Sequence, residues 1–103
     1  MKAAAFGAFM NQGQICMSTE RLIVVDAVAD AFAEKFAAKA ASMAAGDPRE
    51  GNTPLGAVVD QKTVTHVNAL IDDAVAKGAT IRAGGKGESV VMAATVVDNV
   101  TDA

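Results

Sequence analysis

The sequence predicts an α/β domain with an incomplete, mainly parallel sheet that is flanked by helices. Residues 21–25 form a near-continuous apolar run, which is typical of a strand that is covered on both faces. Two longer segments, 26–43 and 60–75, place apolar residues at helical spacing. The strand candidates that follow are short. The first strand therefore has few candidate strands to pair with, and the sheet should be incomplete.

The first half of the chain is expected to hold two helices around that strand. Residues 3–10 form a short apolar helix that should be buried on most sides and should end at Asn11. Asp26 is placed to cap the next helix. The buried stripe of that helix should comprise Val28, Phe32, Phe36, Ala40 and Met43. Gly46 ends the pattern, and residues 46–57 are expected to form a turn-rich loop.

The second half is expected to hold a third helix and short strands. Asp60 is a second plausible cap, and Gly78 stands where a left-handed residue often ends a helix. The apolar stripe between them comprises Val64, Val67, Leu70, Ile71, Ala74 and Val75. Short strands are predicted at residues 80–83, 90–92 and 95–97.

Composition excludes several classes of protein. The chain has 103 residues, a net charge of −3 and no basic stripe, so nucleic-acid binding is not expected. No apolar run approaches the ~20 residues of a membrane span. Four Phe and no Trp or Tyr make for a thin core. A single cysteine fits a reducing compartment, and we expect a cytoplasmic protein.

That cysteine, Cys16, is the most informative residue. A lone thiol cannot form an internal disulfide, so it is a small buried group, a redox target or a nucleophile. A flexible Gly-Gln pair precedes it and a Ser-Thr pair follows it, which favours the nucleophile. A catalytic pair with His66, the single histidine, is a weaker hypothesis because nothing near His66 supports it.

The segment around Cys16 resembles the active-site motif of the NAD(P)-dependent aldehyde dehydrogenase family. The family motif is Phe, then Asn-x-Gly-Gln, then any residue and the nucleophilic cysteine, and residues 9–16 match it throughout. Further matches follow at residues 21–25, 46–48, 56, 84–85 and 94–97, where Ala94 replaces the usual proline. Residues 14–21 are similar to members that oxidise aromatic aldehydes such as vanillin, salicylaldehyde or benzaldehyde.

The resemblance implies a role for each residue of the motif. Cys16 would attack the aldehyde as a thiolate, pass through a thiohemiacetal and a thioester, and help hold the oxyanion with its N–H. Gly13 would allow a tight backbone turn. Ile15 and Met17 would line the aldehyde pocket. Asn11 and Gln14 would shape the loop through hydrogen bonds. The intact family enzymes use NAD or NADP, and no metal is implied.

Other working parts of the family have no match here. We interpret residues 1–103 as a partial aldehyde dehydrogenase catalytic domain without the dinucleotide-binding domain, because no Gly-x-Gly-x-x-Gly opens a helix. No Glu-x-Gly-Gly base motif is present either. We therefore expect no cofactor binding and no turnover from this chain alone.

Two further expectations concern partners. The small-molecule partner of the intact enzyme would be an aldehyde. Open sheet edges and exposed apolar faces should make the chain a homo-oligomer. The alternative from a different class is a non-catalytic α/β module that associates with another chain, and the two differ in what Cys16 does.

Overall fold

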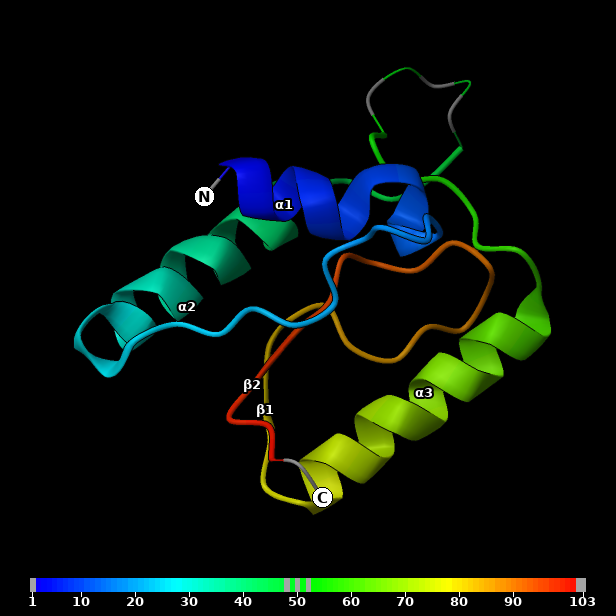
Figure 1. The fold of residues 1–103 in the computed structure, drawn as a ribbon. Helices are drawn as coiled ribbons and strands as arrows, with labels where there is room; N and C mark the ends of the chain where they lie inside the picture. The colour runs from blue at the N-terminus through cyan, green and yellow to red at the C-terminus, as the bar shows by residue number, and fades with distance from the viewer. Residues whose placement is uncertain (1, 48, 50, 52, 102–103) are drawn as a thin grey trace.

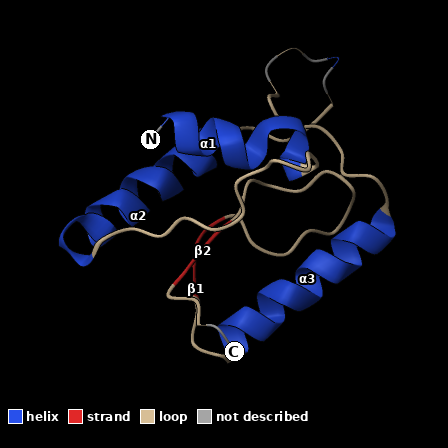
Figure 2. Ribbon diagram, in the orientation of Figure 1, coloured by secondary structure: helices blue, strands red, loops and turns tan. Residues whose placement is uncertain are grey.

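A computed structural model describes residues 2–47, 49, 51 and 53–101. Helices α1 (Lys2–Phe9), η1 (Met10–Gly13, a 3-10 turn), α2 (Asp26–Ser42) and α3 (Gln61–Ala76) precede strands β1 (Thr80–Ala83) and β2 (Val96–Asp98). Helices α1 and α2 lie together, and the two strands run between α2 and α3 (Figures 1 and 2).

Stacked phenylalanine rings join α1 to α2. The ring centroids of Phe9 and Phe36 are 5.9 Å apart, and those of Phe32 and Phe36 are 5.7 Å apart. The stripe predicted for α2 is present in part, because Phe36 is buried while Val28 is 52% exposed. The prediction that the first helix is buried on most sides is wrong: Phe6 is 64% exposed, since α2 covers only one side of α1.

The start of α2 differs from the prediction by one residue. Val25 occupies the N-cap position and makes no side-chain cap hydrogen bond, whereas Asp26 is the first helical residue. Its carboxylate therefore lies in the first turn, where the helix dipole favours a negative charge.

Helix α3 follows its predicted signals closely. The Asp60 carboxylate accepts hydrogen bonds from the N–H and the hydroxyl of Thr63, at 2.9 and 3.0 Å, so the predicted cap is confirmed. The predicted buried stripe is present in part: Val64 and Ile71 are buried, whereas Leu70 is 54% and Val75 is 45% exposed. Gly78 has a φ of +101°, which confirms the left-handed residue beyond the helix.

The sheet corrects the predicted topology. Strands β1 and β2 form a two-stranded antiparallel sheet, with Thr80 opposite Asp98 and Ile81 opposite Val97. The register shifts between Ile81 and Ala83, which is a bulge. A mainly parallel sheet is therefore not what the described residues form, because a short connection rather than a helical crossover joins these two strands.

The connection between the strands explains the Gly-Gly pair at its start. Gly84 has a φ of +67°, and a Cβ there would lie 2.8 Å from the Thr95 Cα. Only glycine fits such a close approach of two backbones. Within the same connection, residues 90–92 form no strand; Val91 makes one isolated antiparallel bridge with Ala57.

The strand predicted at residues 21–25 is also wrong. This segment is irregular in the structure, and its apolar side chains are exposed: Ile23 by 92% and Val25 by 72%. The apolar run was typical of a buried strand, but burial requires neighbouring strands. Within residues 2–47, 49, 51 and 53–101, no strand pairs with it.

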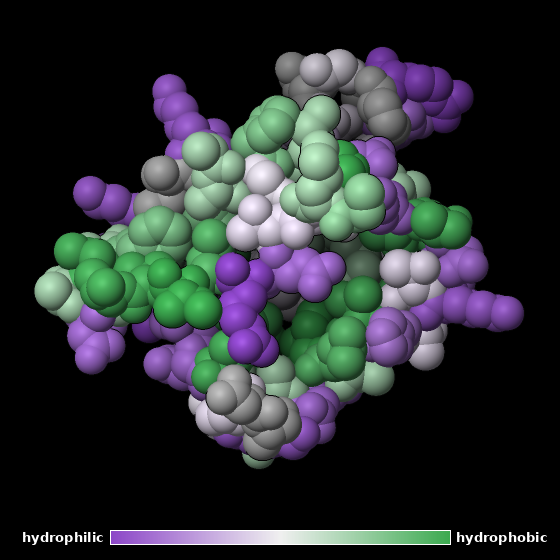
Figure 3. All heavy atoms as spheres, in the orientation of Figure 1, coloured by the Kyte–Doolittle hydropathy of each residue, from purple (hydrophilic) through white to green (hydrophobic). Residues whose placement is uncertain are grey.

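The buried core is small. Ala40, Leu55 and Ala94 form its centre, and partly buried apolar side chains surround them: Phe9, Met43, Ala45, Ala83 and Val96. Alanine contributes little area, so the core is as thin as the composition predicts. Apolar side chains consequently remain at the surface, and Figure 3 shows them gathered on one face around a central hollow. No helix of the described chain is long and apolar enough to cross a membrane.

Candidate active site

Cys16 lies at the apex of a tight turn. The Ser18 N–H donates to the carbonyl oxygen of Ile15 at 2.9 Å, and the Ile15 N–H donates to the Ser18 hydroxyl at 3.3 Å. Cys16 and Met17 therefore occupy the two central positions of the turn. The thiol is free and exposed. Ser18 closes the turn with both its backbone and its side chain.

An unusual backbone leads into this turn. Asn11, Gln12 and Gly13 follow one another with φ values of 53°, 59° and 74°. Left-handed conformations are uncommon for residues other than glycine. The expected turn at Gly13 is present, and a Cβ there would lie 3.2 Å from the carbonyl oxygen of Ala8. These three residues lead into the turn in which Cys16 is exposed.

Side-chain amides hold the loop on one side. The Gln14 Nε2 donates to the Asn11 carbonyl oxygen at 3.2 Å, and the Gln14 Oε1 accepts from the Val59 N–H at 2.8 Å. Gln14 thus bonds to the loop backbone and also connects the loop to the segment before α3. Asn11 contributes to this hydrogen bonding through its backbone carbonyl. The prediction did not specify which group of Asn11 would form hydrogen bonds.

Gln12 makes a second tie that the sequence did not reveal. With its amide oriented to suit both neighbours, its oxygen accepts from the Gly56 N–H at 2.8 Å and its nitrogen donates to the Asn11 carbonyl at 3.3 Å. Gln12 occupies the variable position of the motif. Its partner lies far along the chain, so no local signal could have identified it.

A backbone hydrogen bond holds the loop on the other side. The Thr19 N–H donates to the Gly7 carbonyl oxygen at 2.9 Å. A Cβ on Gly7 would lie 2.8 Å from the Thr19 hydroxyl oxygen, so the chain passes close to α1 here. The cysteine turn is therefore anchored on both sides, to α1 and to the segment before α3.

The surroundings of the thiol are apolar and open. Ile15 is half-buried, and Met17 is 85% exposed. A hollow of about 70 Å³ beside the turn is lined by the neighbours of the thiol but not by Cys16 itself: Phe6, Gly7, Met10, Ile15, Met17 and Ser18. In the described part of the chain, no backbone carbonyl accepts the Cys16 N–H, so that group is available to an oxyanion.

The alternative pairing of Cys16 with His66 is not what the structure shows. His66 is exposed on α3, and the hydrogen bonds of the described residues include none between it and Cys16. Those residues also contain no group of three or more His, Cys, Asp or Glu side chains that could hold a metal ion.

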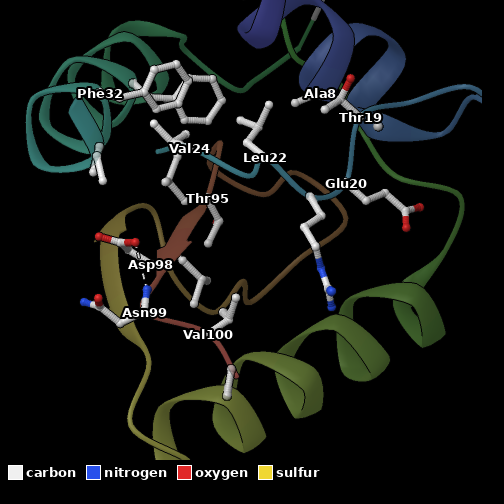
Figure 4. A pocket seen from close by; sticks show the side chains of 18 of the residues that line it. Ala8, Thr19, Glu20, Leu22, Val24, Phe32, Thr95, Asp98, Asn99 and Val100 are labelled. Carbon is white, nitrogen blue, oxygen red and sulfur yellow. Dashed lines mark hydrogen bonds between the residues drawn. The ribbon is translucent and has the colours of Figure 1, made fainter. Parts of the chain in front are cut away.

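A larger hollow, with a volume of about 790 Å³, lies next to the cysteine loop, and Gly13, Ser18 and Thr19 form part of its wall. Its other walls come from α1, from α2 and the segment leading to it, from β2 with the residues after it, and from α3. Figure 4 shows Leu22, Val24 and Phe32 on one side of it and Val100 on the other. Cys16 does not line this hollow, so its size is not evidence for an aldehyde site.

The aldehyde dehydrogenase family profile matches residues 1–103, which is the whole chain. The chain belongs to the aldehyde dehydrogenase family. The family resemblance predicted from the cysteine motif is thereby confirmed.

Individual relatives support the finer resemblance. The chain is 54% identical over 100 residues to vanillin dehydrogenase of Pseudomonas fluorescens, covering 97% of this chain and 21% of the relative. It is 46% identical over 101 residues to salicylaldehyde dehydrogenase of Pseudomonas putida, with the same shares of the two chains. Both relatives are named for aromatic aldehydes, as the motif indicated.

Solved structures give the same result for the fold. A salicylaldehyde dehydrogenase from Pseudomonas putida G7, complexed with salicylaldehyde, superposes with a TM-score of 0.92 at 43% identity. The match covers 98% of this chain and 21% of that one. The architecture is therefore that of the family, while the chain spans about a fifth of the length of the relatives it matches.

Proposed function

We propose that Cys16 is the nucleophile of an aldehyde oxidation to a carboxylic acid, carried out with NAD or NADP by the protein that contains this chain. The observation that carries the proposal is the turn of residues 15–18, which presents the only thiol of a family-matching motif to solvent. A nucleophile must be reachable by its substrate, and an inert core thiol would not be exposed.

The chemistry of this chain's own residues follows from that turn. The Cys16 thiolate forms a bond from Sγ to the carbonyl carbon, and the electron pair of the C=O moves onto oxygen. The free Cys16 N–H can donate to this oxyanion. Loss of hydride from that carbon gives a thioester, and attack by water releases the acid and regenerates the thiolate.

The hydride acceptor would have to be held by other parts of the protein. The N-terminus of α3 carries the Asp60 carboxylate, which already accepts the Thr63 N–H and would repel a pyrophosphate. The exposed segment before α2 contains no glycine-rich turn. Neither of these two places in the described part of the chain fits a dinucleotide, and we propose that this chain alone shows no turnover.

The substrate class that we propose is an aromatic aldehyde. The side chains beside Cys16, Ile15 and Met17, are apolar and could contact an aromatic ring. The names of the relatives at 46–54% identity agree with this class.

Replacing Cys16 in the whole protein tests the proposal. Cys16→Ser and Cys16→Ala should lower kcat for an aromatic aldehyde by at least about 10³-fold, since each removes the attacking atom. The neighbouring substitution Met17→Leu is the matched control and should keep kcat within about threefold. Full turnover in Cys16→Ser would refute the proposal.

The second candidate function is a non-catalytic module that associates with another chain. The observation that favours it is the exposure of Ile23 and Val25, which an isolated soluble protein would rarely leave bare together. We propose that this face supports homo-oligomerisation, and that the protein is cytoplasmic. The rate of iodoacetamide labelling in the native protein separates the two functions, because Cys16 is exposed under both. An activated thiolate labels rapidly near neutral pH, whereas an exposed but unactivated thiol labels at the slow rate of a free cysteine.

A further inference from the structure

Two glutamines of the cysteine loop contact one short segment that lies more than forty residues away in the sequence. With the Gln12 amide oriented so that its oxygen faces Gly56, this oxygen accepts from the Gly56 N–H at 2.8 Å. The Gln14 amide oxygen accepts from the Val59 N–H at 2.8 Å. Residues 56–59 lead directly into the Asp60 cap of α3. The loop that carries Cys16 is therefore fastened to the entry of a helix.

The two ties are not equivalent, because their partners differ in burial. Val59 is 79% exposed, so water can replace Gln14 as the acceptor of its N–H. Gly56 is buried, and a buried backbone N–H without a partner is strongly unfavourable. The Gln12 oxygen satisfies that N–H, and its loss would leave the group unpaired.

The backbone of Gln12 gives an independent indication. Its φ of 59° and ψ of 28° are left-handed, and those of Asn11 before it are too. Glutamine rarely adopts this conformation, which persists where the surroundings impose it. The hydrogen bond from Gly56 to the Gln12 side chain is such a constraint, because it fixes the direction in which that side chain points from the backbone. The residues immediately after it, 13–16, lead to the thiol.

We propose that Gln12 is a positioning residue: it holds the cysteine loop in its reactive geometry by accepting the Gly56 N–H. The proposal rests on Cys16 being the nucleophile. Gln12 does not touch the aldehyde; it acts through the loop, while Gln14 plays a weaker part of the same kind. A nucleophile displaced by about 1 Å loses much of its rate, so a small change in this loop is expected to lower turnover.

Three variants of the whole protein test this role. Gln12→Met removes both hydrogen bonds at similar size, Gln12→Glu keeps an acceptor oxygen, and Gln61→Met makes the same change on the exposed first turn of α3. The measurements are kcat and KM for an aromatic aldehyde, the rate at which iodoacetamide labels Cys16 in the native state, and hydrogen exchange of the peptide containing Gly56.

Gln12→Met should lower kcat by at least about tenfold while KM stays within about twofold, because the loop shifts but the pocket remains. It should also speed exchange at Gly56 and change the labelling rate of Cys16. Gln12→Glu should fall between Gln12→Met and the unchanged protein, and Gln61→Met should match the unchanged protein in all measurements.

The proposal is overturned if Gln12→Met keeps full kcat, whether or not exchange at Gly56 speeds up, or if Gln12→Glu is no better than Gln12→Met. Cys16→Ser, measured in parallel, separates this failure from that of the proposed function. If Cys16→Ser retains turnover, the nucleophile assignment fails. If it abolishes turnover while Gln12→Met is fully active, only the positioning role fails.

Discussion

The cysteine loop and the segment that follows it, residues 20–25, are neighbours in sequence but opposite in character. The loop is fastened to Gly7 on one side and to Gly56 and Val59 on the other. The segment ends in an apolar run whose side chains are mostly exposed, and it pairs with no strand of the described chain. The hydrogen bonds that hold the cysteine loop are thus made among the described residues, whereas the apolar side chains Ile23 and Val25 beside it stay exposed.

The largest expected effect contrasts the same deletion in a buried and an exposed position. Ile71→Ala, on the buried face of α3, should lower the free energy of unfolding by about 2–4 kcal/mol. Ile23→Ala, at a residue that is 92% exposed, should change it by less than about 0.5 kcal/mol. Urea unfolding of the chain measures both. Similar losses in the two variants would mean that residues 20–25 are packed in solution.

The next prediction concerns the loop. Gly13→Ala should destabilise the chain by about 1–2 kcal/mol because its φ of +74° is left-handed and the new Cβ would approach the rigid Ala8 carbonyl. Gly78→Ala is the matched control: its φ of +101° is also positive, but no atom lies within 4 Å of the new Cβ. Thermal melts should show the larger loss for Gly13→Ala, and equal losses would contradict the close packing of the loop.

A third prediction addresses what covers the exposed segment. If residues 20–25 mediate self-association, Ile23→Ser should weaken it by at least about tenfold, since a buried isoleucine contributes apolar area to each contact. Sedimentation velocity over a range of concentrations measures this. Val59→Ser, which changes a side chain that is 79% exposed beside the loop, serves as the control. Equal association in both variants would exclude the segment as the contact.

The smallest expected effect lies outside both regions, in the loop after α2. A bidentate ion pair and a backbone hydrogen bond with Arg49 hold the pKa of the Asp47 carboxyl below its usual value of 3.8. The lowered pKa means that any stabilisation is present above pH 3.8 and is lost as the pH falls through the folded-state value. NMR titration should show this midpoint, and Arg49→Gln should move it upward. An unchanged midpoint would refute the pairing in solution.

A structural element could be predicted from the sequence when the residues that determine it lie close together along the chain. Helix α3 was predicted well because the Asp60 cap and Gly78 act on residues three or four positions away. The strand at residues 21–25 was not, because an apolar run becomes a strand only where neighbouring strands exist. The antiparallel pairing of β1 with β2 likewise depends on the connection between them and not on either strand alone.

The candidate site shows the same division. The motif identified Cys16, and Gly13 and Gln14 have the backbone and hydrogen bonds that a loop-shaping role requires. Gln12 was missed because its acceptor role depends on Gly56, which reaches it only in the folded chain. The side chain at a variable position of a motif can therefore still have a defined hydrogen-bond partner in a distant part of the chain.

The outward position of the single thiol has a practical consequence during purification. Because the turn exposes Cys16 and the chain has no second cysteine, oxidation of this thiol can proceed only by joining two molecules or by forming oxygen acids of sulfur. Preparations without a reductant should therefore accumulate a covalent pair, visible as a doubled band on a gel that dithiothreitol returns to single size.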